Sequence, residues 1–154
     1  MPSKINADEI FEKRLKSCVD ELRWLYMEIY SNGSMFAELC EQIHAFYLSR
    51  SASLRRKDLR REKDPGWYKK NDLLGMMFYI ENFGGDMKGV EKRLDYIEKC
   101  NVNYVHLMPF LDTVPGRSDG GYAVSDFRRV RPDLGTMTDL EHLAKACHKR
   151  GINV

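Results

Sequence analysis

Two short apolar segments separated by a helical pattern constrain the fold of this chain more than any other feature. The segments are residues 74–80 and residues 103–107. An apolar run of this length is typical of a strand in a parallel sheet, because helices cover both faces of such a strand. Between the runs, residues 87–100 repeat apolar side chains at helical spacing. The order strand, helix, strand predicts a βα unit.

The alternation continues through a long loop to another helix and the start of a third strand. Thr138 and Glu141 have capping-box spacing, and Gly151 marks the end of the helix that they open. The alternating region holds two βα units, whereas a closed barrel takes about 250 residues. We therefore expect an α/β fold that contains the first βα units of an incomplete (β/α)8 TIM barrel. We also expect the chain to be a fragment of a larger protein.

The first third of the chain has helical spacing only. Apolar residues recur every three or four positions in residues 10–29 and again in residues 36–47, with Asn32 and Gly33 as the expected stop between two helices. Asp64, Pro65 and Gly66 have the composition of a linker. We predict an amino-terminal helical domain with its linker over residues 1–66, and the truncated amino-terminal part of the barrel over residues 67–154.

Charge and composition argue against several classes of partner. The chain has 25 Lys and Arg against 23 Asp and Glu, so its net charge is +2. This balance gives no electrostatic reason to bind nucleic acid or an anionic membrane. Residues 50–63 are rich in basic side chains, but acids interrupt them, which favours a solvated helix face over a nucleic-acid arm. No apolar signal region opens the chain, so we expect a cytoplasmic protein.

Neither a metal nor a cofactor is predicted. The four cysteines are far apart, and no Cys or His pair has the spacing of a zinc site. The four histidines form no HExxH pattern. Buried, reduced thiols are the expected state of the cysteines.

The loop after the second predicted strand carries the candidate site. Sugars bind where an aromatic ring stacks on an apolar sugar face and polar groups take the hydroxyls. Tyr122 is the candidate platform and Asp119 the candidate acceptor, while Gly120 and Gly121 let the backbone turn tightly. Asp126 is expected to pin the loop by pairing with a neighbouring arginine. The alternative is a plain turn, with Asp119 capping backbone amides and Tyr122 in the core.

At four places the sequence resembles the α-amylase superfamily, glycoside hydrolase family thirteen, and most closely its sucrose-using branch, the amylosucrases. The matching segments are residues 78–86, 105–109, 118–124 and 132–136. The most specific match is Ser-Asp-Gly-Gly-Tyr-Ala-Val after a strand that ends in His-Leu-Met-Pro. The helical first third is also similar to the helical domain that precedes the barrel in that branch. The sequence departs from the family pattern at Glu81, where aspartate is more frequent, and at Gly84, where alanine is.

The resemblance implies a retaining glucosyltransferase that takes glucose from sucrose, releases fructose and extends an α-glucan. It implies that Asp119 and Tyr122 hold the glucosyl unit in the innermost subsite. The family's nucleophilic aspartate and its glutamate acid/base come from later strands, so we expect no catalytic residue within this chain and no activity from it alone. One alternative is a family hydrolase acting on sucrose or maltooligosaccharides. Another is a helical binding module without a catalytic role.

Overall fold

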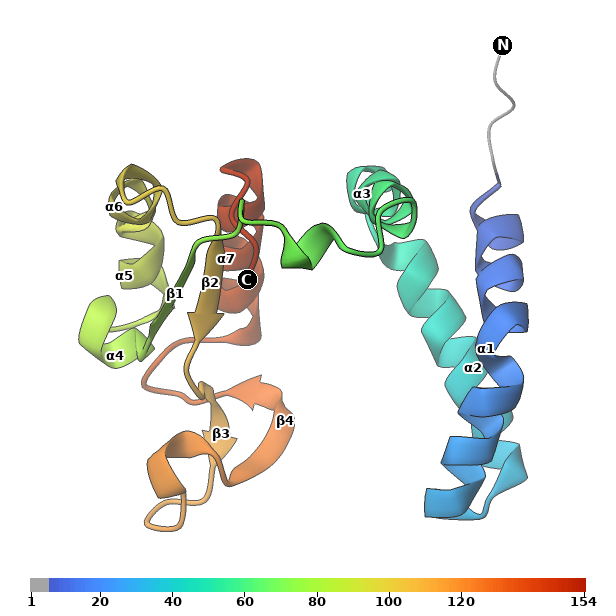
Figure 1. Ribbon diagram of the computed structural model, residues 1–154. Helices are drawn as coiled ribbons and strands as arrows, with labels where there is room; N and C mark the ends of the chain where they lie inside the picture. The colour runs from blue at the N-terminus through green and yellow to red at the C-terminus, as the bar shows by residue number, and fades with distance from the viewer. Residues whose placement is uncertain (1–5) are drawn as a thin grey trace. The chain divides into compact units, whose positions relative to one another are not determined.

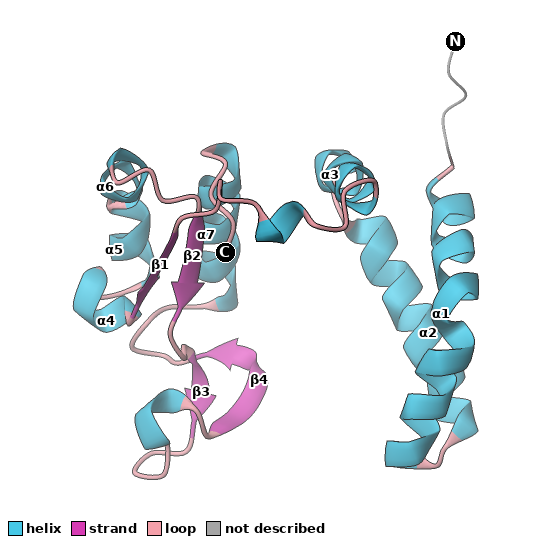
Figure 2. Cartoon of the chain, viewed as in Figure 1, coloured by secondary structure: helices cyan, strands magenta, loops and turns pink. Residues whose placement is uncertain are grey.

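The computed structural model describes residues 6–154, which form two compact units that divide between Pro65 and Gly66. Figure 2 shows helices alone in the first unit and helices with strands in the second. This division lies one residue from the predicted domain boundary, but the functional assignment of the two domains stays a prediction. In chain order the elements are α1 (Ala7–Tyr30), α2 (Gly33–Ser49), α3 (Ala52–Glu62), η1 (Trp67–Lys69), β1 (Gly75–Phe78), α4 (Ile80–Phe83), α5 (Met87–Lys92), α6 (Leu94–Lys99), β2 (Tyr104–Leu107), β3 (Leu111–Thr113), η2 (Asp119–Gly121), β4 (Val124–Val130) and α7 (Met137–Lys149).

The first unit is built on the contact between α1 and α2. Phe11 of α1 stacks on His44 of α2 with 4.4 Å between ring centroids, and His44 Nε2 lies 2.9 Å from the Asp8 carboxylate. The stop between the two helices differs from the predicted one. Ser31 takes the left-handed conformation at φ 48°, and Asn32 caps the start of α2 through the amide of Met35.

The basic segment forms α3, and two acids of α3 pair with arginines that lie outside this helix. Arg50 donates to both oxygens of Asp58, and Arg14 of α1 donates to Glu62 at 2.5 Å. Arg55 donates to the carbonyls of Leu48 and Arg50. These contacts agree with the prediction that this segment is a solvated helix face.

The second unit contains a parallel sheet of β1 and β2, with Gly75 opposite Tyr104 and Phe78 opposite Leu107. Asn153 adds a parallel bridge to Tyr104, where a third strand was predicted to begin. α5 and α7 pack against each other beside this sheet (Figure 1). The predicted α/β fold with the first βα units of an incomplete TIM barrel is therefore confirmed.

One face of the parallel sheet forms the core and the other is open. Val105 and Leu107 point into a cluster of side chains from the helices and the segments next to them, which includes Ile80, Met87, Val90, Leu94, Ile97, Leu134, Leu143, Cys147 and Ile152. On the opposite face Met77 is 66% exposed and Tyr104 is 43% exposed. The strands were predicted to be covered on both faces. Within residues 66–154 helices cover only one, because α5, α6 and α7 all contribute to the same core.

Three further sequence predictions need correction: the helix over residues 87–100, the capping box of α7 and the burial of all four cysteines. The helix expected over residues 87–100 is interrupted at Arg93, whose φ of −100° and ψ of 8° separate α5 from α6. The capping box of α7 is formed by Thr136 and Asp139, two positions before the predicted pair. Among the four cysteines Cys147 is buried, whereas Cys18 is exposed.

Candidate functional site

Both parallel strands end at the same edge of the sheet and lead into the segments that carry the predicted site. β1 ends at Phe78 and β2 ends at Leu107, and the amide of Met108 donates to the Phe78 carbonyl at 2.9 Å. In parallel α/β folds, loops at the carboxyl ends of the strands carry the binding residues. The loop after β2 is therefore the expected place for a ligand.

This loop is more ordered than its composition predicts, because it contains a β-hairpin. β3 and β4 pair antiparallel, with irregular register on both sides of Asp112. The turn η2 lies between them, and its Gly121 amide donates to the Ser118 carbonyl at 2.8 Å. Residues 117–127 were interpreted as a polar loop, although the apolar Val124 and Val130 at the two ends of β4 were a signal for a strand.

Gly121 fixes η2 against the end of β2. Its φ is 94°, and a Cβ at this position would lie 2.9 Å from Cβ of Pro109. A side chain is excluded on both counts, since L residues disfavour this backbone conformation and no space is left. Gly120 also has a positive φ, and its position faces the hydroxyl of Tyr79, which would lie 3.7 Å from an added Cβ. Tyr79 directly follows β1, so both strand ends contribute to this turn.

Asp119 begins η2 and Tyr122 directly follows it, and both side chains are open to solvent. Tyr122 is 62% exposed, and Asp119 is exposed with a left-handed φ of 38°. Within the described residues 6–154, the Asp119 carboxylate makes no hydrogen bond or ion pair. Both side chains are thus free to contact a ligand. Their part in sugar binding stays a prediction.

Asp126 binds its own hairpin, but through a different partner from the predicted one. Its Oδ1 accepts from the backbone amide of Arg128 at 2.8 Å, and no ion pair joins it to either neighbouring arginine among the described residues. Arg129 instead lies 3.7 Å from Asp112 on β3. The short Asp126 side chain on β4 reaches the nearby amide more easily than a guanidinium across the strand.

A cluster of three charged side chains lies at the same edge of the sheet. Arg131 donates from Nε to Asp133 at 2.8 Å and from Nη2 to Glu81 at 2.9 Å. We call these three residues the Arg131 junction. The signal in the sequence was weak: opposite charges follow β1 and β4, but 50 positions separate Glu81 from Arg131.

The junction shifts the pKa values of all three of its members. Burial disfavours the charged form of Glu81, but the hydrogen bond from Arg131, a backbone hydrogen bond and the positive charge of Arg131 together outweigh it, so the pKa of Glu81 lies below its ordinary value. The hydrogen bond from Arg131 likewise lowers the pKa of Asp133. Hydrogen bonds to Asp133 and then to Glu81 raise the pKa of Arg131. The junction is therefore fully charged at neutral pH.

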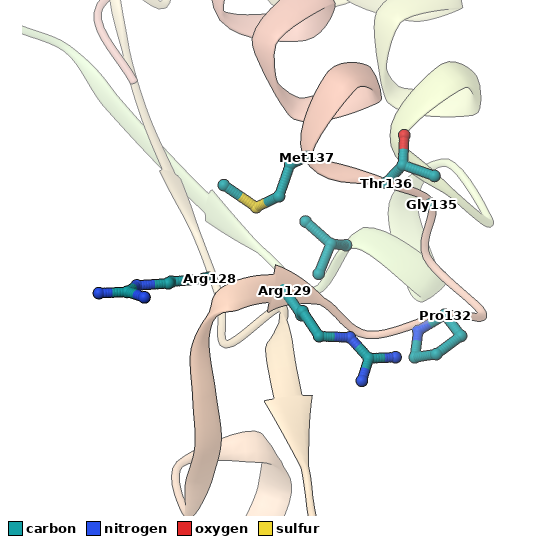
Figure 3. Close-up of a pocket in the computed structure, with 7 residues that line it drawn as sticks. Arg128, Arg129, Pro132, Gly135, Thr136 and Met137 are labelled. Carbon is teal, nitrogen blue, oxygen red and sulfur yellow. The ribbon is translucent and has the colours of Figure 1, made fainter.

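Two open cavities flank the hairpin. One, of about 570 Å³, is lined by Asp112, Thr113, Val114, Pro115, Ser125, Arg131, Pro132 and Asp133. The other, of about 310 Å³, lies between the end of β4 and the start of α7 (Figure 3). Its two arginines, Arg128 and Arg129, extend in different directions, so their guanidinium groups do not converge on one ligand (Figure 3).

Residues 6–154 contain no group of three or more His, Cys, Asp or Glu side chains arranged to hold a metal ion. No helix in the same range is long and apolar enough to span a bilayer.

Comparison with known proteins extends these observations. The family model of the alpha amylase catalytic domain matches residues 30–154. The match begins at the end of α1, so it covers much of the first unit as well as the whole second unit. It covers the strand ends, η2 and the Arg131 junction.

Individual relatives match a shorter stretch. The trehalose synthase/amylase TreS of Mycolicibacterium smegmatis is 40% identical over 96 residues, which are 59% of this chain and 16% of the relative. The trehalose-6-phosphate hydrolase of Bacillus subtilis is 31% identical over 103 residues, 62% of this chain and 18% of the relative. A solved family GH13_31 enzyme is 33% identical with a TM-score of 0.51, over 56% of this chain and 17% of that one. The chain thus spans less than a fifth of the length of these relatives.

Proposed function

Because this chain belongs to the α-amylase catalytic-domain family, we propose that it is the amino-terminal part of a retaining enzyme that acts on α-linked glucosides. The family match over residues 30–154 and the parallel strands β1 and β2 support this proposal. The activity itself belongs to a longer polypeptide, since the relatives are several times longer than these 154 residues.

Asp119 and Tyr122 hold the glucosyl unit in this proposal. The Tyr122 ring stacks on the apolar face of the sugar, and the Asp119 carboxylate accepts from its hydroxyls. The observation that carries the proposal is the solvent exposure of these two side chains on a rigid turn. They are solvent-exposed on a turn that Gly121 locks against Pro109, so a ligand meets them in a fixed geometry.

For the substrate we propose an α-linked disaccharide of glucose. The sequence resemblance to the amylosucrases favours sucrose as glucosyl donor, with release of fructose and extension of an α-glucan. The names of the relatives favour hydrolysis or rearrangement of a trehalose-type disaccharide instead. Both reactions use the same glucosyl subsite, so Asp119 and Tyr122 have the same role in each.

The chemical step requires groups beyond those of the proposed subsite. Retaining glycosidases and transglycosylases use two carboxyl groups about 5 Å apart, one as nucleophile and one as acid/base. We propose that residues outside this chain supply both. The purified 154-residue polypeptide is then expected to release neither fructose from sucrose nor glucose from trehalose.

The test uses the native polypeptide that carries these residues, incubated with sucrose, trehalose, maltose and maltotriose. Free fructose with α-glucan identifies the transferase, free glucose the hydrolase, and a new disaccharide the rearranging enzyme. Asp119→Asn is expected to lower kcat/KM about 10- to 100-fold by loss of charge-assisted hydrogen bonds. Tyr122→Ala is expected to lower it about tenfold by loss of stacking.

Matched controls lie elsewhere on the second unit. Asp95→Asn removes an exposed carboxylate of α6, and Tyr68→Ala removes an aromatic ring that is 55% exposed. Both control variants should have kcat/KM values within about twofold of that of the unsubstituted protein. Turnover of none of the four sugars by the native polypeptide would refute the enzyme proposal in favour of a binding module. Equal effects of Asp119→Asn and Asp95→Asn would refute the site.

A further inference from the structure

We propose that Arg131 is a positioning residue for the sugar-binding turn. In this role it holds the turn after β1 to the turn after β4, and thereby fixes Tyr79 beside Gly120. The inference rests on the proposed function and adds to it a residue that does not itself touch the sugar.

Arg131 connects three segments that meet at the carboxyl edge of the parallel sheet. Its guanidinium binds Glu81 in α4, which follows β1, and Asp133 in the turn that follows β4. Its backbone amide donates at 2.8 Å to the carbonyl of Phe110, which follows β2. One residue therefore joins the chain after both parallel strands and after the hairpin.

The junction differs from an ordinary surface ion pair. The Arg131 side chain is 24% exposed and meets its two carboxylates at 2.9 Å or less. Arg129, by contrast, is 63% exposed and lies 3.7 Å from its single partner Asp112. Exposed single pairs contribute little, whereas a guanidinium that binds two acids at once holds both in a defined geometry. Arg129 is therefore the natural control for Arg131.

A single helical turn carries the effect from the junction to the proposed sugar site. Glu81 lies in α4, whose first hydrogen bond runs from the Phe83 amide to the Tyr79 carbonyl at 3.1 Å. Fixing Glu81 therefore fixes Tyr79, one residue before the helix begins. The hydroxyl of Tyr79 in turn lies against Gly120, between Asp119 and Gly121. Release of Glu81 would let Tyr79 and η2 shift together.

The experiment compares Arg131→Met, Arg131→Lys, Glu81→Gln and the Arg131→Met/Glu81→Gln double variant with the control Arg129→Met. All are made in the native polypeptide. The readouts are kcat and KM for the sugar that it turns over, and amide hydrogen exchange of peptides covering residues 79–86 and 118–124. The second readout does not depend on activity.

Arg131→Met is expected to lower kcat/KM about 10- to 100-fold, mainly through KM, because displacement of binding groups by about 1 Å has effects of this size. Exchange should accelerate in both peptides. Arg131→Lys should recover part of the loss, since an ammonium group serves one carboxylate at a time. The double variant should be no worse than Arg131→Met, because both substitutions break the same contact. Arg129→Met should change neither readout.

Arg131→Met with kcat/KM within twofold of the unsubstituted protein, or with unchanged exchange in residues 118–124, would overturn the proposal. Accelerated exchange confined to residues 79–86 would also overturn it, because the junction would then hold its own turn only. If Arg131→Met does not fold, Glu81→Gln applies the same test with little change of volume. If the native polypeptide turns over no α-glucoside, the proposed function fails, and the exchange data still decide whether Arg131 positions η2.

Discussion

Gly121 shows how much one residue determines at the proposed sugar site. It allows the backbone to reverse at φ 94° within contact of Pro109, and this reversal leaves Asp119 and Tyr122 exposed on the loop. The sequence predicted a tight turn here, because two consecutive glycines rarely serve another purpose in a loop. It did not predict the contact with Pro109, which depends on how the loop returns to the end of β2.

Gly121→Ala should therefore destabilise the second unit more than a glycine replacement without the contact. We expect a loss of about 2–4 kcal/mol, the sum of left-handed strain and overpacking. Gly116→Ala is the control, because Gly116 also has a positive φ, at 74°, but nothing lies within 4 Å of an added Cβ. Gly116→Ala should lower the free energy of unfolding by about 1 kcal/mol. Urea unfolding measures both, and equal losses would show that the Pro109 contact is unimportant.

A second glycine explains a departure from the family pattern. At Gly84, an added Cβ would overlap the backbone of Gly89 and Val90 at the start of α5. The alanine that is more frequent in the family at this position does not fit the close approach of α4 to α5. Glycine at this position therefore fits the local packing of α4 against α5.

At the scale of elements, the sequence predicted those whose periodicity is strong and whose ends are marked. β1, β2 and α7 were all identified, since apolar runs and a helical stripe define them. The β3–β4 hairpin was missed, because β3 has only three residues, the register is irregular, and polar residues interrupt the apolar ones in both strands. The break at Arg93 was missed because Val90, Leu94 and Ile97 enter the core on both sides of it, so the apolar spacing continues unchanged.

The N-terminus of α7 offers a direct test between the two candidate caps. Thr136 accepts from the Asp139 amide, and Asp139 accepts in return from the Thr136 amide and hydroxyl. Thr136→Ala should cost about 1 kcal/mol of unfolding free energy. Thr138→Ala, at the predicted cap, should be neutral or slightly stabilising, because alanine has the higher helix propensity. A larger loss for Thr138→Ala in denaturant unfolding would reverse the assignment.

At the scale of the whole molecule, the candidate site was partly predictable. Asp119, Gly120, Gly121 and Tyr122 were named from one short segment, because chemistry and turn residues coincide there. The Arg131 junction was not recognised as a unit, since no sequence pattern links Glu81 to Arg131 across 50 positions. Contacts of this kind arise only when two strand ends meet, and sheet topology determines them.

The open face of the parallel sheet gives a prediction for the 154-residue polypeptide in isolation. Met77 of β1 is 66% exposed, and within residues 6–154 β1 pairs with β2 alone, so its other edge is open; an exposed apolar side chain beside an open strand edge promotes association. Met77→Lys should reduce self-association and the binding of an apolar dye. Met35→Lys, which replaces a methionine of α2 that is 53% exposed, should leave both nearly unchanged. Sedimentation velocity measures self-association and dye fluorescence measures dye binding. Equal responses of Met77→Lys and Met35→Lys would show that the open face of the sheet is not the surface that associates.

The β3–β4 hairpin forms a sheet of its own, and it adjoins the parallel core through Pro109 and the Arg131 junction. At its tip, nothing lies within 4 Å of a Cβ added at Gly116. Insertions or deletions at that tip can therefore reshape the entrance to the site while the barrel strands keep their register. In proteins with this architecture, changes in the length of this loop can therefore alter ligand preference with little effect on the stability of the fold.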